Sequence, residues 1–140
     1  MKYERILCAG SFDGLHLGHV EYFKQAKRLG KKVIVVVSSD ENYMKRKGFP
    51  PLHSQDERMK VLAQIKLIDE VVKGSKGNIL DVVKKISPDA ILLGYDDHNK
   101  EEELKSKLKE AGLEIEIIRA EPYEEKRLKS SLVKEIWKKT

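Results

Sequence analysis

The chain has 140 residues, of which 40% are hydrophobic and 36% are charged, and this balance predicts one folded domain spanning residues 1–140 and excludes a largely disordered chain. No apolar run approaches the roughly 20 residues that cross a bilayer, and the charged start MKYER differs from a secretory signal. We therefore expect a cytoplasmic protein without a membrane span. The formal net charge of +5 favours anionic ligands such as phosphates.

The first half of the chain alternates apolar runs with helical patterns. Val33 to Val37 is an uninterrupted β-branched run, which is typical of a strand covered on both faces. Ser54 with Glu57 three residues on has the spacing of a capping box and predicts a helix start. The predicted elements are a strand at residues 6–9, a helix at 17–29 closed by Gly30, a strand at 33–37, a loop within 40–51 and a helix from about 54 to 68.

The second half repeats this alternation. The segment AILLG, residues 90–94, has the composition of a buried strand. The predicted elements are a strand at 70–74, a helix near 79–86, a strand at 90–94, a helix at 100–111, a strand at 113–119 and a terminal helix capped by Ser130 or Ser131. Because strands alternate with helices, we expect βαβ crossovers and an α/β fold, with a mainly parallel five-stranded sheet covered by helices on both faces.

Polar residues gather where the predicted strands end. Ligands of an open parallel sheet bind beyond the carboxyl ends of its strands, and the segment GSFDGLHLGH, residues 10–19, follows the first strand. The helix starting near Leu17 would direct free amide groups and its positive dipole end there. His16 and His19 lie three residues apart, so both rings can donate to one phosphate. Ordinary polar residues at a helix start are the alternative interpretation.

Two other chemistries are less favoured at this loop. A zinc site would need a third ligand, and none lies close to the two histidines in sequence. The single cysteine, Cys8, sits within an apolar run, where core packing is the expected role.

The residues Gly-Ser-Phe-Asp-Gly-Leu-His-Leu-Gly-His resemble the signature of the cytidylyltransferase-like nucleotidyltransferases, which carry G-x-F-D followed by H-x-G-H. The resemblance extends over most of the chain. LHSQDER, residues 52–58, is similar to the family's loop-to-helix segment, and KSSLVKEI, residues 129–136, resembles its closing helix start. It implies a Rossmann-like three-layer α/β/α fold and transfer of a nucleoside monophosphate from a nucleoside triphosphate to a phosphate monoester, with release of pyrophosphate.

The resemblance also implies roles for individual residues. Lys45 and Lys47 match basic positions of a mobile phosphate-contacting loop, and Arg119 competes with Arg127 for a phosphate-binding role near the last strand. The implied catalytic residues are His16, His19, Lys45 and Arg58. The implied nucleotide-binding residues are Gly10, Ser11, Phe12, Asp13, Gly18, Gly94, Asp96, Arg127, Ser130 and Ser131. The implied acceptor-binding residues are Lys47, Tyr95 and Asp97. We expect Mg²⁺ or another divalent cation with the triphosphate and assign no metal ligand in the chain.

The choice of substrates depends on the residues after the fourth predicted strand. Gly94-Tyr95-Asp96 looks like the corresponding segment of archaeal FAD synthases, which implies ATP and FMN as substrates. A glycerol-3-phosphate-type cytidylyltransferase that uses CTP with a polyol phosphate, or a sugar-phosphate adenylyltransferase, is the alternative. A non-catalytic nucleotide- or RNA-binding module is a more remote one, since aromatic residues make up 6% of the chain without a basic-aromatic cluster. We expect no nucleic-acid partner, and a homodimer is compatible with the resemblance.

Overall fold

The computed structural model describes residues 2–95 and 98–122, which form a five-stranded parallel sheet. The strands are β1 (Tyr3–Gly10), β2 (Gly30–Val37), β3 (Glu70–Lys73), β4 (Ala90–Leu93) and β5 (Glu116–Arg119). Their order across the sheet is β3-β2-β1-β4-β5, and every neighbouring pair is parallel. The α/β fold with a parallel five-stranded sheet predicted from the sequence is thereby confirmed.

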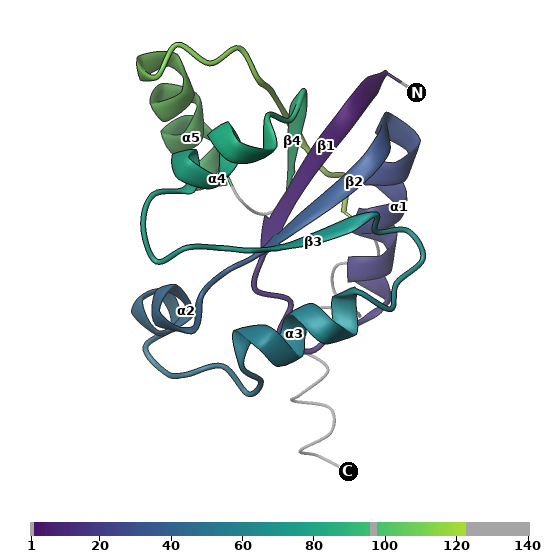
Figure 1. Cartoon of the computed structure of the whole chain (residues 1–140), viewed down its shortest axis with the longest axis vertical. Coiled ribbons are helices and arrows are strands. Elements are labelled where there is room, and N and C mark those ends of the chain that lie inside the picture. The colour runs from purple at the N-terminus through teal and green to yellow at the C-terminus, as the bar shows by residue number, and fades with distance from the viewer. Residues whose placement is uncertain (1, 96–97, 123–140) are drawn as a thin grey trace.

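Helices cover both faces of the sheet, as Figure 1 shows. They are α1 (Leu17–Leu29), α2 (Asp40–Lys47), α3 (Gln55–Leu62), α4 (Ile79–Ile86) and α5 (His98–Glu110). One buried apolar cluster joins α1 and α3 to one face of the sheet, and a second joins α4 and α5 to the other. The predicted three-layer arrangement is therefore confirmed. None of the helices in the described ranges is long and apolar enough to cross a membrane.

The central strand β1 supplies both faces of the core. Ile6 and Cys8 lie in the cluster beneath α1, whereas Leu7 lies in the cluster beneath α4 and α5. Successive side chains of a strand point to opposite faces, so a run of apolar residues is buried throughout. Cys8 is fully buried, which confirms its predicted place in the core.

The segment 40–51 contains the predicted loop, but its first eight residues form a helix. Residues 40–47 form α2, because the Ser39 hydroxyl accepts the backbone N–H of Asn42 at 3.0 Å and caps the helix start. Gly48 ends the helix with φ of 83°, a left-handed conformation that glycine adopts without a side-chain clash. The loop is thus confined to residues 48–54. Helix α3 is also shorter than the predicted span of 54–68, since it ends at Leu62.

Gly30 joins α1 directly to β2. It is the C-cap of α1, as predicted, but its φ of −131° is extended rather than left-handed. The glycine is required by packing, because a Cβ atom at this position would lie 2.9 Å from Cγ2 of Ile6. A glycine at this junction therefore lets β2 start directly against Ile6 of β1.

Candidate active site

The segment that carries the two histidines lies where the strand order reverses. β1 has β2 on one side and β4 on the other, so the connections that follow β1 and β4 diverge from this point. Cys8 pairs with Leu92, and Gly10 and Gly94 each follow two residues after these partners, at the same edge of the sheet. Open α/β sheets bind ligands at such a switch point, outside the carboxyl ends of the strands. Residues 10–19 thus lie at the carboxyl edge of the sheet, where the sequence places them.

His16 and His19 hold each other at the start of α1. The Nδ1 atom of His16, the N-cap residue, accepts the backbone N–H of Gly18 at 3.0 Å. The Nδ1 atom of His19 accepts the backbone N–H of His16 at 3.1 Å. The two ring centroids are 4.0 Å apart. A neutral imidazole whose Nδ1 accepts a hydrogen bond carries its proton on Nε2, so this network assigns an Nε2–H donor to both rings.

Both imidazoles are neutral near pH 7. Burial lowers the pKa of His19 from 6.5 to about 4, with a further contribution from the neighbouring His16. Burial also lowers the pKa of His16. Removing a charged imidazolium from water is unfavourable, which is why the neutral form is preferred. The pair is therefore a set of two adjacent uncharged donors with a fixed tautomer.

The backbone N–H groups of Gly18, His19 and Val20 are engaged within the start of α1. Gly18 donates to the His16 ring at 3.0 Å. The N–H groups of His19 and Val20 both point to the carbonyl oxygen of His16, at 3.0 Å and 3.3 Å. This differs from the predicted set of free amide groups, because the histidine side chains and a tightened first turn use them. The imidazole Nε2–H groups and the positive end of the helix dipole are the features of this helix start that favour an anion.

Phe12 fills the space beneath the histidine pair. Its side chain is 8% exposed, and its ring lies edge-on to His19 with centroids 5.7 Å apart. A Cβ atom at Gly10 would lie 2.9 Å from the Phe12 ring. The Phe12 ring thus occupies the space that a side chain at position 10 would need, and the predicted nucleotide contact of Gly10 stays a prediction. Phe12 has φ of 51°, a strained conformation for a residue with a bulky side chain.

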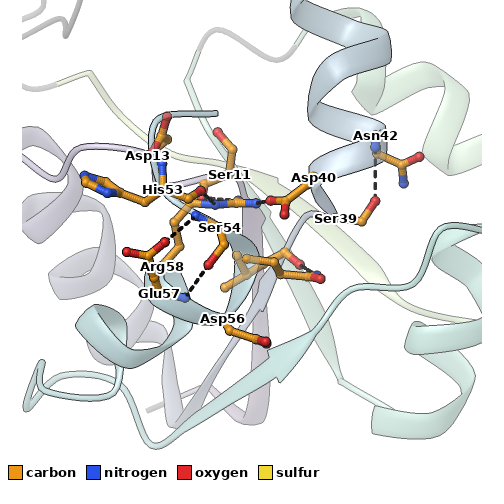
Figure 2. A network of polar contacts seen from close by, with 12 residues as sticks. Ser11, Asp13, Ser39, Asp40, Asn42, His53, Ser54, Asp56, Glu57 and Arg58 are labelled. Atoms are coloured by element: carbon orange, nitrogen blue, oxygen red, sulfur yellow. Dashed lines mark hydrogen bonds and ion pairs between the residues drawn. The ribbon is translucent and has the colours of Figure 1, made fainter. Parts of the chain in front are cut away.

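Arg58 is a buried cation on α3 that binds three other segments (Figure 2). Its Nη1 donates to the carbonyl oxygen of Ser11 at 2.8 Å, and its Nε donates to that of His53 at 3.1 Å. Its Nη2 lies 2.7 Å from Oδ1 of Asp40, and its side chain is 1% exposed. The sequence predicts a phosphate-contacting arginine at this position, but the guanidinium is directed at protein acceptors.

Asp13 joins the same two loops from the opposite side. Its Oδ2 accepts the backbone N–H of Leu52 at 2.7 Å, and its Oδ1 accepts that of His53 at 3.1 Å. The carboxylate predicted to bind nucleotide is thus occupied with backbone donors of the loop before α3. Ser11, another predicted nucleotide contact, gives its carbonyl oxygen to Arg58 and is half-buried.

The two predicted basic contacts of the mobile loop lie on α2. The Lys45 side chain is 70% exposed, and its Nζ is 3.7 Å from a carboxylate oxygen of Glu41. Lys47 is exposed in the last turn of the same helix. The loop assignment is corrected because Ser39 and Gly48 cap this segment at its two ends. Their contact with phosphate stays a prediction.

The remaining predicted residues follow β4 or lie near the end of the chain. Gly94 and Tyr95 are half-buried and directly follow β4. Arg119 ends β5 and pairs with Glu101 of α5. The predicted residues outside the described part of the chain are Asp96, Asp97, Arg127, Ser130 and Ser131.

Sequence reasoning missed two side chains that organise this edge of the sheet. Asp40 is the carboxylate partner of Arg58, and its place directly after the second strand was the available signal. The buried amide of Gln55 donates to the carbonyl oxygens of Val37 and Gly74, at 2.9 Å each. Val37 is the last residue of β2, and Gly74 directly follows β3. Gln55 therefore fastens α3 to the ends of two neighbouring strands. No local pattern distinguishes Gln55 from a solvated residue at a helix start.

Comparisons with known proteins agree on one family. The family model described as cytidylyltransferase-like matches residues 7–136. A FAD synthase of Pyrococcus horikoshii is 47% identical over 120 residues, which cover 85% of this chain and 80% of that protein. A FAD synthase of Thermoplasma volcanium is 35% identical over 130 residues, covering 93% of this chain and 91% of that protein. The resemblance deduced from the sequence is confirmed.

Solved structures give the same fold. A crystal structure titled as a lipopolysaccharide core biosynthesis protein from Thermoplasma volcanium is 34% identical, with a TM-score of 0.81 over 87% of this chain and 99% of that one. A pantoate-beta-alanine ligase from Francisella tularensis is 16% identical, with a TM-score of 0.67 over 95% of this chain and 65% of that one. The second likeness concerns the fold alone.

Proposed function

Because the chain belongs to the cytidylyltransferase-like family, we propose that its 140 residues form one nucleotidyltransferase domain that transfers AMP from ATP to FMN and releases pyrophosphate. The observation that carries this proposal is the pair of neutral Nε2–H donors of His16 and His19 at the switch point of the sheet. Two donors in fixed positions suit the non-bridging oxygens of a phosphoryl group under attack.

The choice of ATP and FMN is supported by the similarity of this chain to FAD synthases, which extends over most of its length. FAD synthases of Pyrococcus abyssi and Thermococcus sibiricus are 44% and 42% identical over 131 and 120 residues. The segment Gly94-Tyr95 follows β4 at the same edge as the histidine pair, where an acceptor could meet the nucleotide. A tyrosine ring offers a flat apolar surface for a base or a flavin. We propose that Tyr95, with Lys47 and Asp97, contributes to the acceptor site.

The reaction needs positioning more than proton transfer. An oxygen of the FMN phosphate attacks the α-phosphorus in line, the bond from that phosphorus to the bridging oxygen breaks, and pyrophosphate leaves with the electron pair. The attacking oxygen is already anionic, so no strong general base is required. His16 and His19 would donate Nε2–H bonds to the α-phosphate oxygens, where negative charge develops.

Other parts of the site would hold the triphosphate. We propose phosphate contacts from Lys45 on α2 and from the segment that contains Arg127, Ser130 and Ser131, and ribose or base contacts from Gly94 and Asp96. A divalent cation such as Mg²⁺ would shield the negative charge of the triphosphate when bound. Mg²⁺ often binds through substrate phosphates and its own waters rather than a protein cage. The described residues include no group of three or more His, Cys, Asp or Glu that could hold a metal.

Measurement of pyrophosphate release with matched substrate pairs tests the proposal. Purified protein is given ATP with FMN, ATP with a sugar phosphate, or CTP with glycerol 3-phosphate, each with Mg²⁺, and the nucleotide product is identified by mass spectrometry. We expect FAD and pyrophosphate in equal amounts from the first pair. Turnover with CTP and glycerol 3-phosphate alone would establish the cytidylyltransferase alternative. Nucleotide binding without release from any pair would instead favour a binding module.

A further inference from the structure

We propose that Arg58 and Asp13 are positioning residues, which together form a loop clamp that sets the orientation of His19 through Phe12. The loop clamp consists of these two side chains and the backbone that they bind at Ser11, Leu52 and His53. This inference rests on the proposed role of the histidine pair in phosphoryl transfer. It gives Arg58 and Asp13 a function other than the direct nucleotide contacts expected from the sequence.

The loop before α3 is held from both sides by the clamp. Asp13 accepts the backbone N–H groups of Leu52 and His53, at 2.7 Å and 3.1 Å. Nε of Arg58 donates a hydrogen bond to the carbonyl oxygen of His53 at 3.1 Å. The N–H of His53 and its carbonyl oxygen are therefore bound to two different side chains. Hydrogen bonds to charged groups are stronger than neutral ones, so this loop is a firm support for the segment that follows β1.

The segment after β1 is held on both sides of its strained residue. Arg58 binds the carbonyl oxygen of Ser11 at 2.8 Å, directly before Phe12, and the carboxylate of Asp13 is fastened directly after it. Phe12 itself has φ of 51°. A residue persists in such a conformation when the surrounding structure over-determines it. The loop clamp supplies that constraint, because each neighbour of Phe12 is bound to another segment.

The Phe12 ring transmits this constraint to the histidine pair. It stands edge-on to His19 with centroids 5.7 Å apart, and it packs on Phe23 of α1 at 5.3 Å. On its other side it fills the space beside Gly10. A shift of the segment 11–13 would therefore move the surface against which the His19 ring rests. Because misplacement by about 1 Å can cost ~100-fold in rate, the clamp would affect catalysis without touching substrate.

The surroundings of Arg58 support a positioning role. Its guanidinium is enclosed, with 1% of the side chain exposed, and it already binds the Asp40 carboxylate at 2.7 Å. The Tyr43 ring centroid lies 5.9 Å from its central carbon, a distance at which a cation is attracted to an aromatic face. To reach a phosphate, Arg58 would have to leave these partners and so release the segment after β1.

The test compares Arg58→Lys and Asp13→Asn with the parent protein. Lysine keeps the charge but cannot reach two carbonyl oxygens and a carboxylate with a planar fork. Asparagine keeps one acceptor and loses the other. Arg28→Lys, an exposed arginine in the last turn of α1, is the matched control. Four quantities are measured: thermal unfolding, the ¹⁵N shifts of the His19 ring, kcat and KM with ATP and FMN, and calorimetric affinity for inorganic pyrophosphate.

We expect both clamp variants to lower kcat by about tenfold or more and to shift or broaden the His19 ring signals, while KM for ATP and pyrophosphate affinity stay within about twofold of the parent. Arg28→Lys should behave as the parent. A fall in pyrophosphate affinity of about tenfold in Arg58→Lys with unchanged His19 signals would overturn the proposal in favour of direct phosphate contact. Unchanged His19 signals and unchanged kcat in both variants would overturn it as well.

The histidine signals keep this test separate from that of the proposed function. If the parent protein does not convert ATP and FMN, the proposed function fails, whereas the ¹⁵N comparison still decides whether the clamp orients His19. If Arg58→Lys does not fold, Asp13→Asn decides alone, because the Asp13 carboxylate accepts the backbone N–H groups of Leu52 and His53 and does not balance the buried guanidinium.

Discussion

The carboxylate of Asp40 lies 2.7 Å from the guanidinium of Arg58, yet the Asp40 side chain is 50% exposed and the Arg58 side chain 1%. The ion pair thus neutralises a cation that is enclosed in protein. Removing one partner of a buried pair is costly because the other charge is left without compensation.

Asp40→Asn should therefore lower the free energy of unfolding by about 2 kcal/mol, somewhat less than for a fully buried pair because Asp40 is half exposed. Urea denaturation checks this. Asp56→Asn is the matched control, since the Asp56 side chain is 71% exposed and its carboxylate lies 3.3 Å from Nζ of Lys73, whose side chain is 60% exposed. Equal losses in the two variants would contradict a special role for the Arg58 pair.

Substitutions of His19 can separate the two functions of its ring, which are the Nδ1 acceptor at the helix start and the Nε2–H donor proposed to bind phosphate. Asparagine places an acceptor near the position of Nδ1, which binds the His16 N–H, but has no group at Nε2. Glutamine places an N–H donor near Nε2. We expect His19→Asn to lower kcat by about 100-fold, equivalent to about 3 kcal/mol, and His19→Gln to retain more activity. Steady-state kinetics with ATP and FMN measure this, with circular dichroism as the control for folding. Rates within about threefold of the parent in His19→Asn would contradict the donor role.

Stability should depend on pH through His19. Burial lowers its pKa from 6.5 to about 4 in the folded protein, so the unfolded chain binds a proton there first. The contribution of the neutral His19 to the free energy of unfolding is fully present above pH 6.5. It falls as the pH decreases from 6.5 to about 4, by as much as about 3 kcal/mol in total. Urea midpoints of the parent and of His19→Gln, compared over this window, isolate the effect. A constant difference between the two proteins would contradict it.

The junction of α1 and β2 should not tolerate a side chain. In Gly30→Ala the new methyl group would meet Cγ2 of Ile6 at 2.9 Å, so the core must shift. We expect a loss of about 2 kcal/mol of stability from overpacking. Gly77→Ala is the matched control, because the nearest atom to its new methyl group would be 3.7 Å away. Thermal unfolding of both variants measures the difference, and similar melting temperatures would show that the contact relaxes freely.

Cys8 should be inert in the folded protein. It is fully buried in β1, and burial raises the pKa of its thiol to about 12. The thiolate is the reactive form, so a maleimide should label Cys8 at the rate of unfolding rather than at the rate of a free thiol. Labelling followed by mass spectrometry, in buffer and in urea, tests this. Rapid labelling in buffer would indicate local opening of the central strand.

Local patterns were sufficient to predict most of the fold. The run Val33 to Val37 and the segment 90–94 gave strands, because a strand buried on both faces is apolar throughout. Helix α2 was missed because its sequence is almost entirely polar and two prolines follow closely. Its formation depends on a serine cap at one end and Gly48 at the other, which stabilise a short helix that apolar periodicity cannot reveal.

The site was predictable where it is contiguous in sequence. His16 and His19 belong to one turn, so their shared orientation follows from helical spacing. The partners of Arg58 at positions 11, 40 and 53 come from two loops and the first residue of α2. Which acceptor a buried guanidinium finds depends on how those loops pack, and spacing in sequence carries no information about it. This is why Arg58 was assigned to phosphate and Asp40 was overlooked.

The hydrogen bonds accepted by the rings of His16 and His19 also join the stability of α1 to the composition of the site. Each ring caps the helix that carries it, and loss of a cap typically costs about 1 kcal/mol. A substitution that removes either ring therefore loosens the start of α1 and takes away a donor at the same time. Turnover measurements on such variants need a measurement of the helix start beside them, because a loss of activity alone does not separate the two effects.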